Sequence, residues 1–356
     1  MLWRAYALLS HGGDRIGLRL RRSRPSPAPL RRPAEVLRRL DELDAAIWSA
    51  NALSAAVEAG LLDHLDGPAS PDEIARRTGL PPAIVLALVD VLAGFGFARR
   101  EGGAVSAAPG FAPFTGPEGA RAFRAALRAP LLQAEAFRRD ARAGAVTLDG
   151  WRHEDPEVIE AQGALTSLWA GRAIPRLRFL PGLVRRLEAR GAALLDVGAG
   201  AAGLSITLCR HYPALSATAL EPAPGPAEVG ARHVRAAGLE DRIEIRRQRV
   251  EHLDERAAYD LAFLPQMFLP DAVIEPAAAA LFRALKPGGW LLAATLARQG
   301  GDLGAAVARL KNLLWGGNLR DADGIGRLLA AAGFDPVIRS PGRGVIRMIC
   351  ARRPPA

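Results

Sequence analysis

The chain has 356 residues, of which 49% are hydrophobic and 24% charged, and its formal net charge is +10. This length is sufficient for two domains with a full core. The two cysteines and six histidines lack metal-ligand spacing, which excludes a metal centre built on those residues.

Residues 1–40 form a basic arm. They contain ten arginines and two acidic residues, a local net charge of +8, so about +2 remains for the rest of the chain. The body is therefore nearly neutral, and the high pI says little about its substrate. With four prolines between 25 and 33, the arm is predicted to be a flexible or partly helical extension, and a solvated tail is favoured over contact of its arginines with an anionic surface. The apolar run 5–9 is too short for a signal peptide, which predicts a cytoplasmic protein.

Residues 41–115 predict a helical domain of winged helix-turn-helix layout. Ser70-Pro71-Asp72-Glu73 is a helix start with a capping box, followed by helices 71–78 and 81–93 and a small hairpin. The second helix contains no Lys, Arg, Asn or Gln, so it lacks the side chains that read a DNA groove. Asp90 interrupts its apolar run, which argues against integral membrane association. Burial in a homodimer or against the catalytic domain, without nucleic acid, is the favoured interpretation.

Residues 116–187 predict a helical linker. His153-Glu154-Asp155 has the composition of an acid–base cluster. The favoured interpretation is a helix start at Asp155-Pro156-Glu157.

The segment 194–203 predicts a nucleotide-binding corner in the domain 188–356. An apolar strand ends at Asp196 and breaks into a glycine-rich turn before helix 204–211. Gly198 and Gly200 let the backbone approach a ligand closely. Because Asp196 would repel a pyrophosphate, the corner favours a cationic ligand, S-adenosylmethionine (SAM), over a dinucleotide. A tight turn without a ligand is the alternative.

A second acidic residue follows the next strand. Strand 215–220 ends at Glu221, about 20 residues past the glycines, where a carboxylate can accept hydrogen bonds from ribose hydroxyls.

The remaining elements alternate between helices and strands, which indicates a parallel, doubly wound sheet. Helix 226–237, strands 242–246 and 259–264, and helix 271–285 precede a Lys286-Pro287-Gly288-Gly289 turn and strand 290–296. After helix 323–332, strands 334–339 and 345–351 are joined by the short turn 340–344 and must be antiparallel.

These motifs resemble those of class I SAM-dependent methyltransferases. With the front half, the chain is similar to the winged-helix O-methyltransferases of secondary metabolism. The resemblance implies a Rossmann-like α/β fold with a seven-stranded sheet, an N-terminal all-helical winged-helix-type domain that dimerises, and a small-molecule acceptor. It implies cofactor-binding roles for Asp196, Gly198, Gly200, Glu221, Val250 and Pro265. It also implies that the linker 116–187 lines the substrate site. Candidate wall residues there, each also explained by ordinary packing, are Trp151, Gln162, Trp169 and Arg172.

Two positions depart from that family. Leu269 stands where the family has its histidine base. Arg249 stands where the family tends to have an aspartate that binds the adenine amino group, so backbone groups near Val250, or Glu251, would bind the adenine instead. No catalytic residue is predicted, and Gln266 can orient an acceptor but not deprotonate it. Methyl transfer would rely on proximity, to an acidic phenol, a thiol or a carbon nucleophile. The alternatives are a SAM-binding protein with other chemistry and a DNA-binding regulator.

Overall fold

The computed structural model describes residues 30–147, 151, 153–296, 303–339 and 346–355. They divide into two compact units, 30–132 and 133–355, which are described separately. The division falls inside α5 (Gly116–Arg142). Most of the predicted arm, residues 1–29, and the predicted turn at 340–344 lie outside the described residues.

The first unit is mainly helical. Its further elements are α2 (Pro33–Glu58), η1 (Leu61–His64), α3 (Pro71–Thr78), α4 (Pro82–Gly94), β1 (Ala98–Glu101), β2 (Ala104–Ala107) and η2 (Ala112–Phe114). The start of α3 is confirmed, since Ser70 Oγ accepts the N–H of Glu73 at 3.2 Å. The Glu73 carboxylate, however, pairs with Arg77 at 2.6 Å. The antiparallel hairpin β1–β2 makes this unit mainly, rather than entirely, helical.

One face of helix α4 packs into its own unit, and the other face is exposed. Val85, Leu88, Val89 and Leu92 are buried in the core of this unit, while Ile84 is 48% exposed. No single helix among the described residues is long and apolar enough to cross a membrane; α3 and α4 reach the required length and hydropathy only as a pair bent by 111°.

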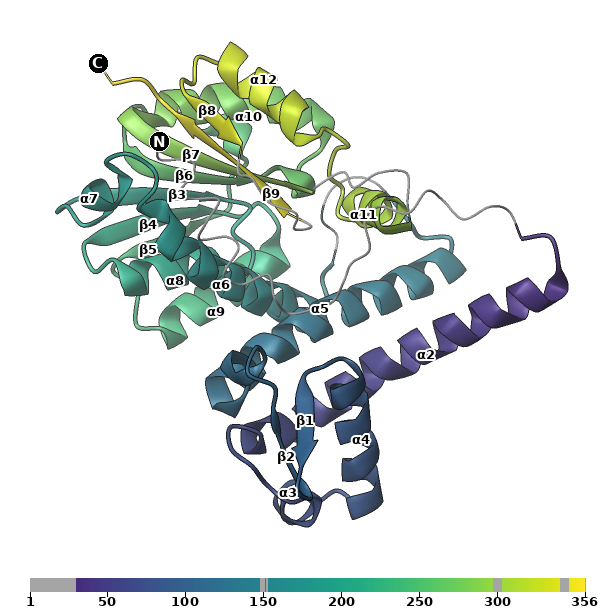
Figure 1. The fold of residues 1–356 in the computed structure, drawn as a ribbon. Coiled ribbons are helices and arrows are strands. Elements are labelled where there is room, and N and C mark those ends of the chain that lie inside the picture. The colour runs from purple at the N-terminus through teal and green to yellow at the C-terminus, as the bar shows by residue number, and fades with distance from the viewer. Residues whose placement is uncertain (1–29, 148–150, 152, 297–302, 340–345, 356) are drawn as a thin grey trace. The chain divides into compact units, whose positions relative to one another are not determined.

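The second unit is built on one seven-stranded sheet (Figure 1). Its strands are β3 (Ala192–Val197), β4 (Leu215–Leu220), β5 (Ile243–Arg246), β6 (Tyr259–Pro265), β7 (Leu285–Leu296), β8 (Val337–Arg339) and β9 (Ile346–Arg352). The order across the sheet is β5-β4-β3-β6-β7-β9-β8. Strands β3 to β7 are parallel, and β9 is antiparallel to both β7 and β8, as predicted.

Helices cover both faces of this sheet (Figure 1). The α-helices of this unit, besides the end of α5, are α6 (Pro156–Leu177), α7 (Leu183–Leu187), α8 (Gly203–His211), α9 (Pro224–Ala236), α10 (Asp271–Ala284), α11 (Leu303–Leu314) and α12 (Ala322–Ala331). Its short 3-10 helices are η3 (Val250–His252) and η4 (Gln266–Phe268). Alternate residues of a strand serve opposite faces, so Leu194 packs in the cluster with α8 and Leu195 in the cluster with α10. Burial on both faces explains the continuous apolar run of β3.

The Lys286-Pro287-Gly288-Gly289 segment was predicted as a turn before a strand. In the structure it lies within β7, where Leu285 pairs with Tyr259 but Trp290 already pairs with Leu261. Strand β7 thus holds extra residues that bulge from the ladder, and Gly288 there has φ +76°.

Candidate active site

The glycine-rich turn lies at the carboxyl end of β3, where that strand has β4 on one side and β6 on the other. In open α/β sheets such a switch point is where ligands bind. Gly198 and Gly200 have φ values of +62° and +54°, a region that favours glycine. Ala202 shares this conformation at φ +59° and directly precedes α8. The turn therefore presents backbone without side chains at this edge.

Asp196 is buried under the turn, with 2% of its surface exposed. Ser205 Oγ, in the first turn of α8, donates a hydrogen bond to its carboxylate at 2.7 Å. Burial raises the pKa of Asp196 to about 7, against the lowering effect of Ser205. The carboxyl therefore carries its full negative charge only above neutral pH, and that charge favours a cationic ligand.

This shift predicts a pH-dependent stability. Between its usual pKa of 3.8 and about 7, the carboxyl of Asp196 stays protonated in the folded protein but ionises when unfolded. The folded state then binds more protons, so stability falls as pH rises through this window. Compared with Asp196→Asn, the free energy of unfolding of the wild type should fall by on the order of 2 kcal/mol between pH 5 and 7. Above pH 8 it should change little. Thermal unfolding of both proteins across pH measures this; a constant difference would contradict it.

Glu221 lies beside the turn at the end of β4. Its carboxylate accepts the N–H of Gly200 at 2.9 Å and that of Ala223 at 3.0 Å. Burial raises the pKa of Glu221, and the two N–H donors oppose that rise. A carboxylate can accept about four hydrogen bonds, so each oxygen retains capacity for a hydroxyl donor. Glu221 thus shapes the turn and remains able to bind a ligand.

The other predicted cofactor residues lie at the same edge. A Cβ added to Gly198 would lie 3.8 Å from Pro265 Cγ, so the end of β6 meets the turn. Val250 is buried in the cluster that includes Val197 and Leu220. Arg249 is exposed and lies 3.8 Å from the carboxylate of Glu251.

Helix α6 packs against the turn from the other side. A Cβ on Gly163 would approach that of Ala201 to 2.4 Å, and one on Gly203 would approach the Gly163 carbonyl oxygen to 2.5 Å. The sequence did not predict the roles of Gly163 and Ser205. Gly163 packs against the turn although it lies far from it in the sequence, and Ser205 donates to the buried Asp196, and neither contact is marked by a sequence motif.

The turn η4 follows β6 at its carboxyl end. Gln266 is fully buried, and its Nε2 donates to Thr295 Oγ1. The side chain of Asn318 donates to the carbonyls of Gln266 at 3.1 Å and Leu269 at 3.0 Å, and accepts the N–H of Arg320 at 2.9 Å. Leu269 packs in the core cluster with α10. The side chain of Leu269 is therefore part of the apolar core and provides no base.

Beyond η4 lies an aromatic cluster, Trp151, Phe268 and Trp315. The centre of the Phe268 ring lies 5.5 Å from that of the Trp151 ring, with the two rings edge to face, and 4.9 Å from that of the Trp315 ring. The ring of His153 contacts that of Trp151, with 4.7 Å between the ring centres. Burial lowers the pKa of His153. The imidazole is therefore mostly neutral at pH 7.

The predicted wall residues separate into two groups. Trp151 belongs to the aromatic cluster, and Gln162 joins it through Gln133, which accepts the indole N–H of Trp315 at 3.1 Å. Trp169 instead packs on Phe263 against the core, and Arg172 is exposed. The helix start is confirmed, since Asp155 caps the N–H of Glu157 at 2.9 Å.

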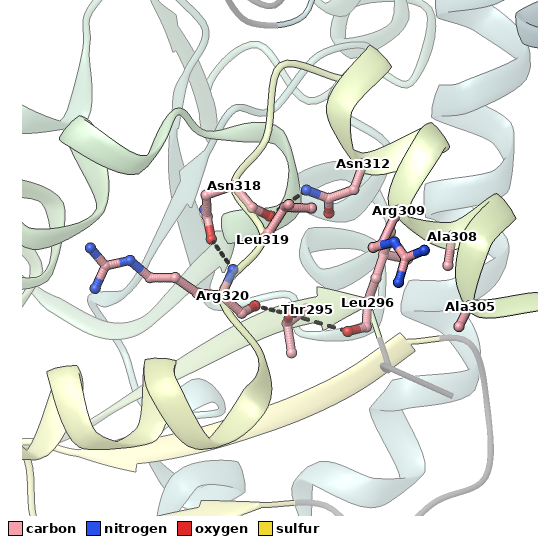
Figure 2. Close-up of a pocket in the computed structure, with 9 residues that line it drawn as sticks. All are labelled: Thr295, Leu296, Ala305, Ala308, Arg309, Asn312, Asn318, Leu319 and Arg320. Atoms are coloured by element: carbon pink, nitrogen blue, oxygen red, sulfur yellow. Dashed lines mark hydrogen bonds between the residues drawn. The ribbon is translucent and has the colours of Figure 1, made fainter. Parts of the chain in front are cut away.

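A small pocket lies between β7 and α11 (Figure 2). Thr295, Asn312 and Asn318 are among its lining residues, and its volume is about 30 Å³. That space is too small for an aromatic acceptor. Within the described ranges, no group of three or more His, Cys, Asp or Glu side chains could hold a metal ion.

The sheet order and the glycine turn define a class I methyltransferase fold. Residues 194–289 match the model of a protein family described as a methyltransferase domain.

Similar proteins were found by sequence and by structure. The 3-hydroxy-5-methyl-1-naphthoate 3-O-methyltransferase of Streptomyces sahachiroi is 27% identical over 215 residues, which cover 58% of this chain and 61% of that enzyme. The chain thus matches about three fifths of its length. An O-methyltransferase family protein from Burkholderia thailandensis has a TM-score of 0.63 at 18% identity, covering 92% of this chain and 100% of that one. Human N-acetylserotonin methyltransferase in complex with SAM has a TM-score of 0.59 at 18% identity, with coverages of 92% and 100%.

Proposed function

We propose that the protein transfers a methyl group from SAM to an oxygen of a small-molecule acceptor. The observation that carries this proposal is the glycine turn at the carboxyl end of β3, with Asp196 buried beneath it and Glu221 hydrogen-bonded to it. The methyltransferase-domain match over 194–289 supports it. The relative from Streptomyces sahachiroi, named for 3-O-methylation of a hydroxynaphthoate, supports an aromatic hydroxyl as acceptor.

The residues at this edge fit the cofactor. Gly198 and Gly200 leave room for close backbone approach, Glu221 would accept hydrogen bonds from the ribose, and Asp196 would favour the positive charge. Val250 and Pro265 would contact the adenosine half. When bound, SAM supplies the electrophilic methyl group. The protein's contribution is to orient the acceptor and exclude water, since Leu269 provides no base.

Two measurements test this function. Calorimetry with S-adenosylhomocysteine should show saturable binding at one site per chain. Incubation with SAM and a panel of naphthols and hydroxynaphthoates should yield methylated product and equimolar S-adenosylhomocysteine. Tight cofactor binding with product lacking the added methyl group would support other chemistry, and absence of cofactor binding would contradict the proposal outright.

We further infer that residues 41–115 form a dimerisation domain, with the contact centred on α2 rather than α4. Helix α2 exposes large apolar side chains at successive spacings of four, three and four: Val36, Leu40, Leu43 and Ile47, between 44% and 61% exposed. That spacing produces one apolar stripe along the helix. Trp48, 69% exposed, extends it. Exposed apolar stripes of this kind are typical of protein interfaces.

The dimer is tested by a charge placed in the stripe. We expect the wild type to sediment as a dimer and Leu43→Glu/Ile47→Glu to sediment as a monomer, because two carboxylates would have to be desolvated in the contact. Ala45→Glu adds the same kind of charge to an exposed position on the opposite face of α2 and should leave the dimer intact. A wild type that is monomeric at all accessible concentrations would contradict the inference.

A further inference from the structure

The two lysines of the chain have different electrostatic environments. Lys286 donates to the Asp260 carboxylate at 2.6 Å, and Asp260 also accepts the N–H of Ala193 at 3.1 Å. Lys286 is thus part of a structural ion pair at the N-terminal end of β6. Lys311, in the last turn of α11, has no carboxylate within ion-pair distance among the described residues.

Lys311 borders the aromatic cluster. Its Nζ lies 5.7 Å from the centre of the Trp315 ring, which in turn contacts Phe268. Partial burial lowers the pKa of Lys311, and no acidic residue in the described part of the chain opposes this effect. A half-buried ammonium without a counter-ion loses hydration that the cation–π contact restores only in part. An anionic group beside it would supply the missing interaction.

The opposite end of the cluster has two acidic residues and one basic residue. His153, which contacts Trp151, interacts electrostatically with Asp140, Arg139 and Asp155. Because the summed charge of these three side chains is negative, an anion is less favourable at that end than beside the ammonium of Lys311. Between the two ends, the rings of Trp151, Phe268 and Trp315 provide apolar surface. Phe268 follows Pro265 by three residues, so the cluster begins close to the glycine turn.

The geometry points to Lys311 as the counter-ion of an anionic group on a planar aromatic acceptor, whose ring packs against Trp151, Phe268 and Trp315. This inference rests on the proposed function and specifies its substrate class. Lys311 acts here as a specificity-determining residue. The ring surface selects a flat acceptor, and the ammonium selects a carboxylate or an acidic hydroxyl on it.

Two probes of equal shape test the charge. The protein is titrated with 2-naphthoate and with the neutral 2-naphthamide, with and without saturating S-adenosylhomocysteine, and binding is followed by calorimetry and tryptophan fluorescence. We expect the wild type to bind 2-naphthoate about tenfold more tightly than the amide, the effect of one charge-assisted contact. Lys311→Met should reduce this ratio to about one, and Lys311→Arg should retain most of it.

Arg309→Met is the matched control, since it removes an exposed cation from the same helix without affecting the cluster, and it should keep the wild-type ratio. Unfolding temperature and S-adenosylhomocysteine affinity show whether each variant remains folded. Equal affinities in the wild type, a ratio preserved in Lys311→Met, or failure of both probes to bind would overturn the inference. Loss of S-adenosylhomocysteine binding alone would contradict the proposed function while leaving the probe ratio measurable.

Discussion

Replacement of Glu221 by alanine is expected to weaken S-adenosylhomocysteine binding by about 10- to 100-fold. The carboxylate holds the N–H groups of Gly200 and Ala223, so its removal loosens the glycine turn as well as removing the acceptor for the ribose. Hydrogen bonds to charged groups contribute about 1.5–3 kcal/mol, and each 1.4 kcal/mol corresponds to about a factor of ten in affinity. Calorimetry of wild type and variant measures the difference.

Glu244→Ala provides the control for that measurement. Glu244 lies on the neighbouring strand β5, its side chain is 60% exposed, and it pairs with Arg246. Its removal should change the affinity by less than about twofold, since exposed ion pairs contribute little. If Glu221→Ala binds as tightly as wild type while keeping its unfolding temperature, Glu221 does not contact the cofactor.

The donor side of the site could be predicted from local sequence because its residues follow strand ends. In a parallel sheet, side chains after successive strands meet at one edge, so Asp196 and Glu221 could be brought together from their positions alone. The left-handed glycines are likewise a local property of the turn. The β7 bulge was missed, since Pro287 and Gly288 are also typical of a free turn, and only pairing with β6 and β9 distinguishes the two.

The acceptor side depends on contacts between distant segments. Phe268, Trp151 and Trp315 meet although more than 100 residues separate the first and second, and no periodicity connects them. Asn318 follows two glycines, a pattern typical of any turn. A Cβ on Gly317 would approach the Met267 carbonyl oxygen to 1.7 Å, so this backbone packs directly on η4. Such close packing is specified by tertiary structure rather than by local sequence.

Asn318 is expected to be the most sensitive position on the acceptor side. Its side chain is 5% exposed and satisfies the carbonyls of Gln266 and Leu269 and the N–H of Arg320. Asn318→Ala leaves these groups buried without that partner, at a cost of about 1–3 kcal/mol for each group that cannot recover one. We expect a loss of about 2–4 kcal/mol, lowering the unfolding temperature by about 5–15 °C.

Gln248→Ala removes an amide that donates to His252 at 2.8 Å in an exposed setting, and should change the unfolding temperature by less than about 2 °C. The contrast tests whether burial, rather than the loss of an amide hydrogen bond as such, makes Asn318 important. Because Asn318 also fixes the turn that carries Phe268, methyl transfer by folded Asn318→Ala should fall further than its S-adenosylhomocysteine affinity. Equal losses in acceptor turnover and cofactor binding would show that η4 does not position the acceptor.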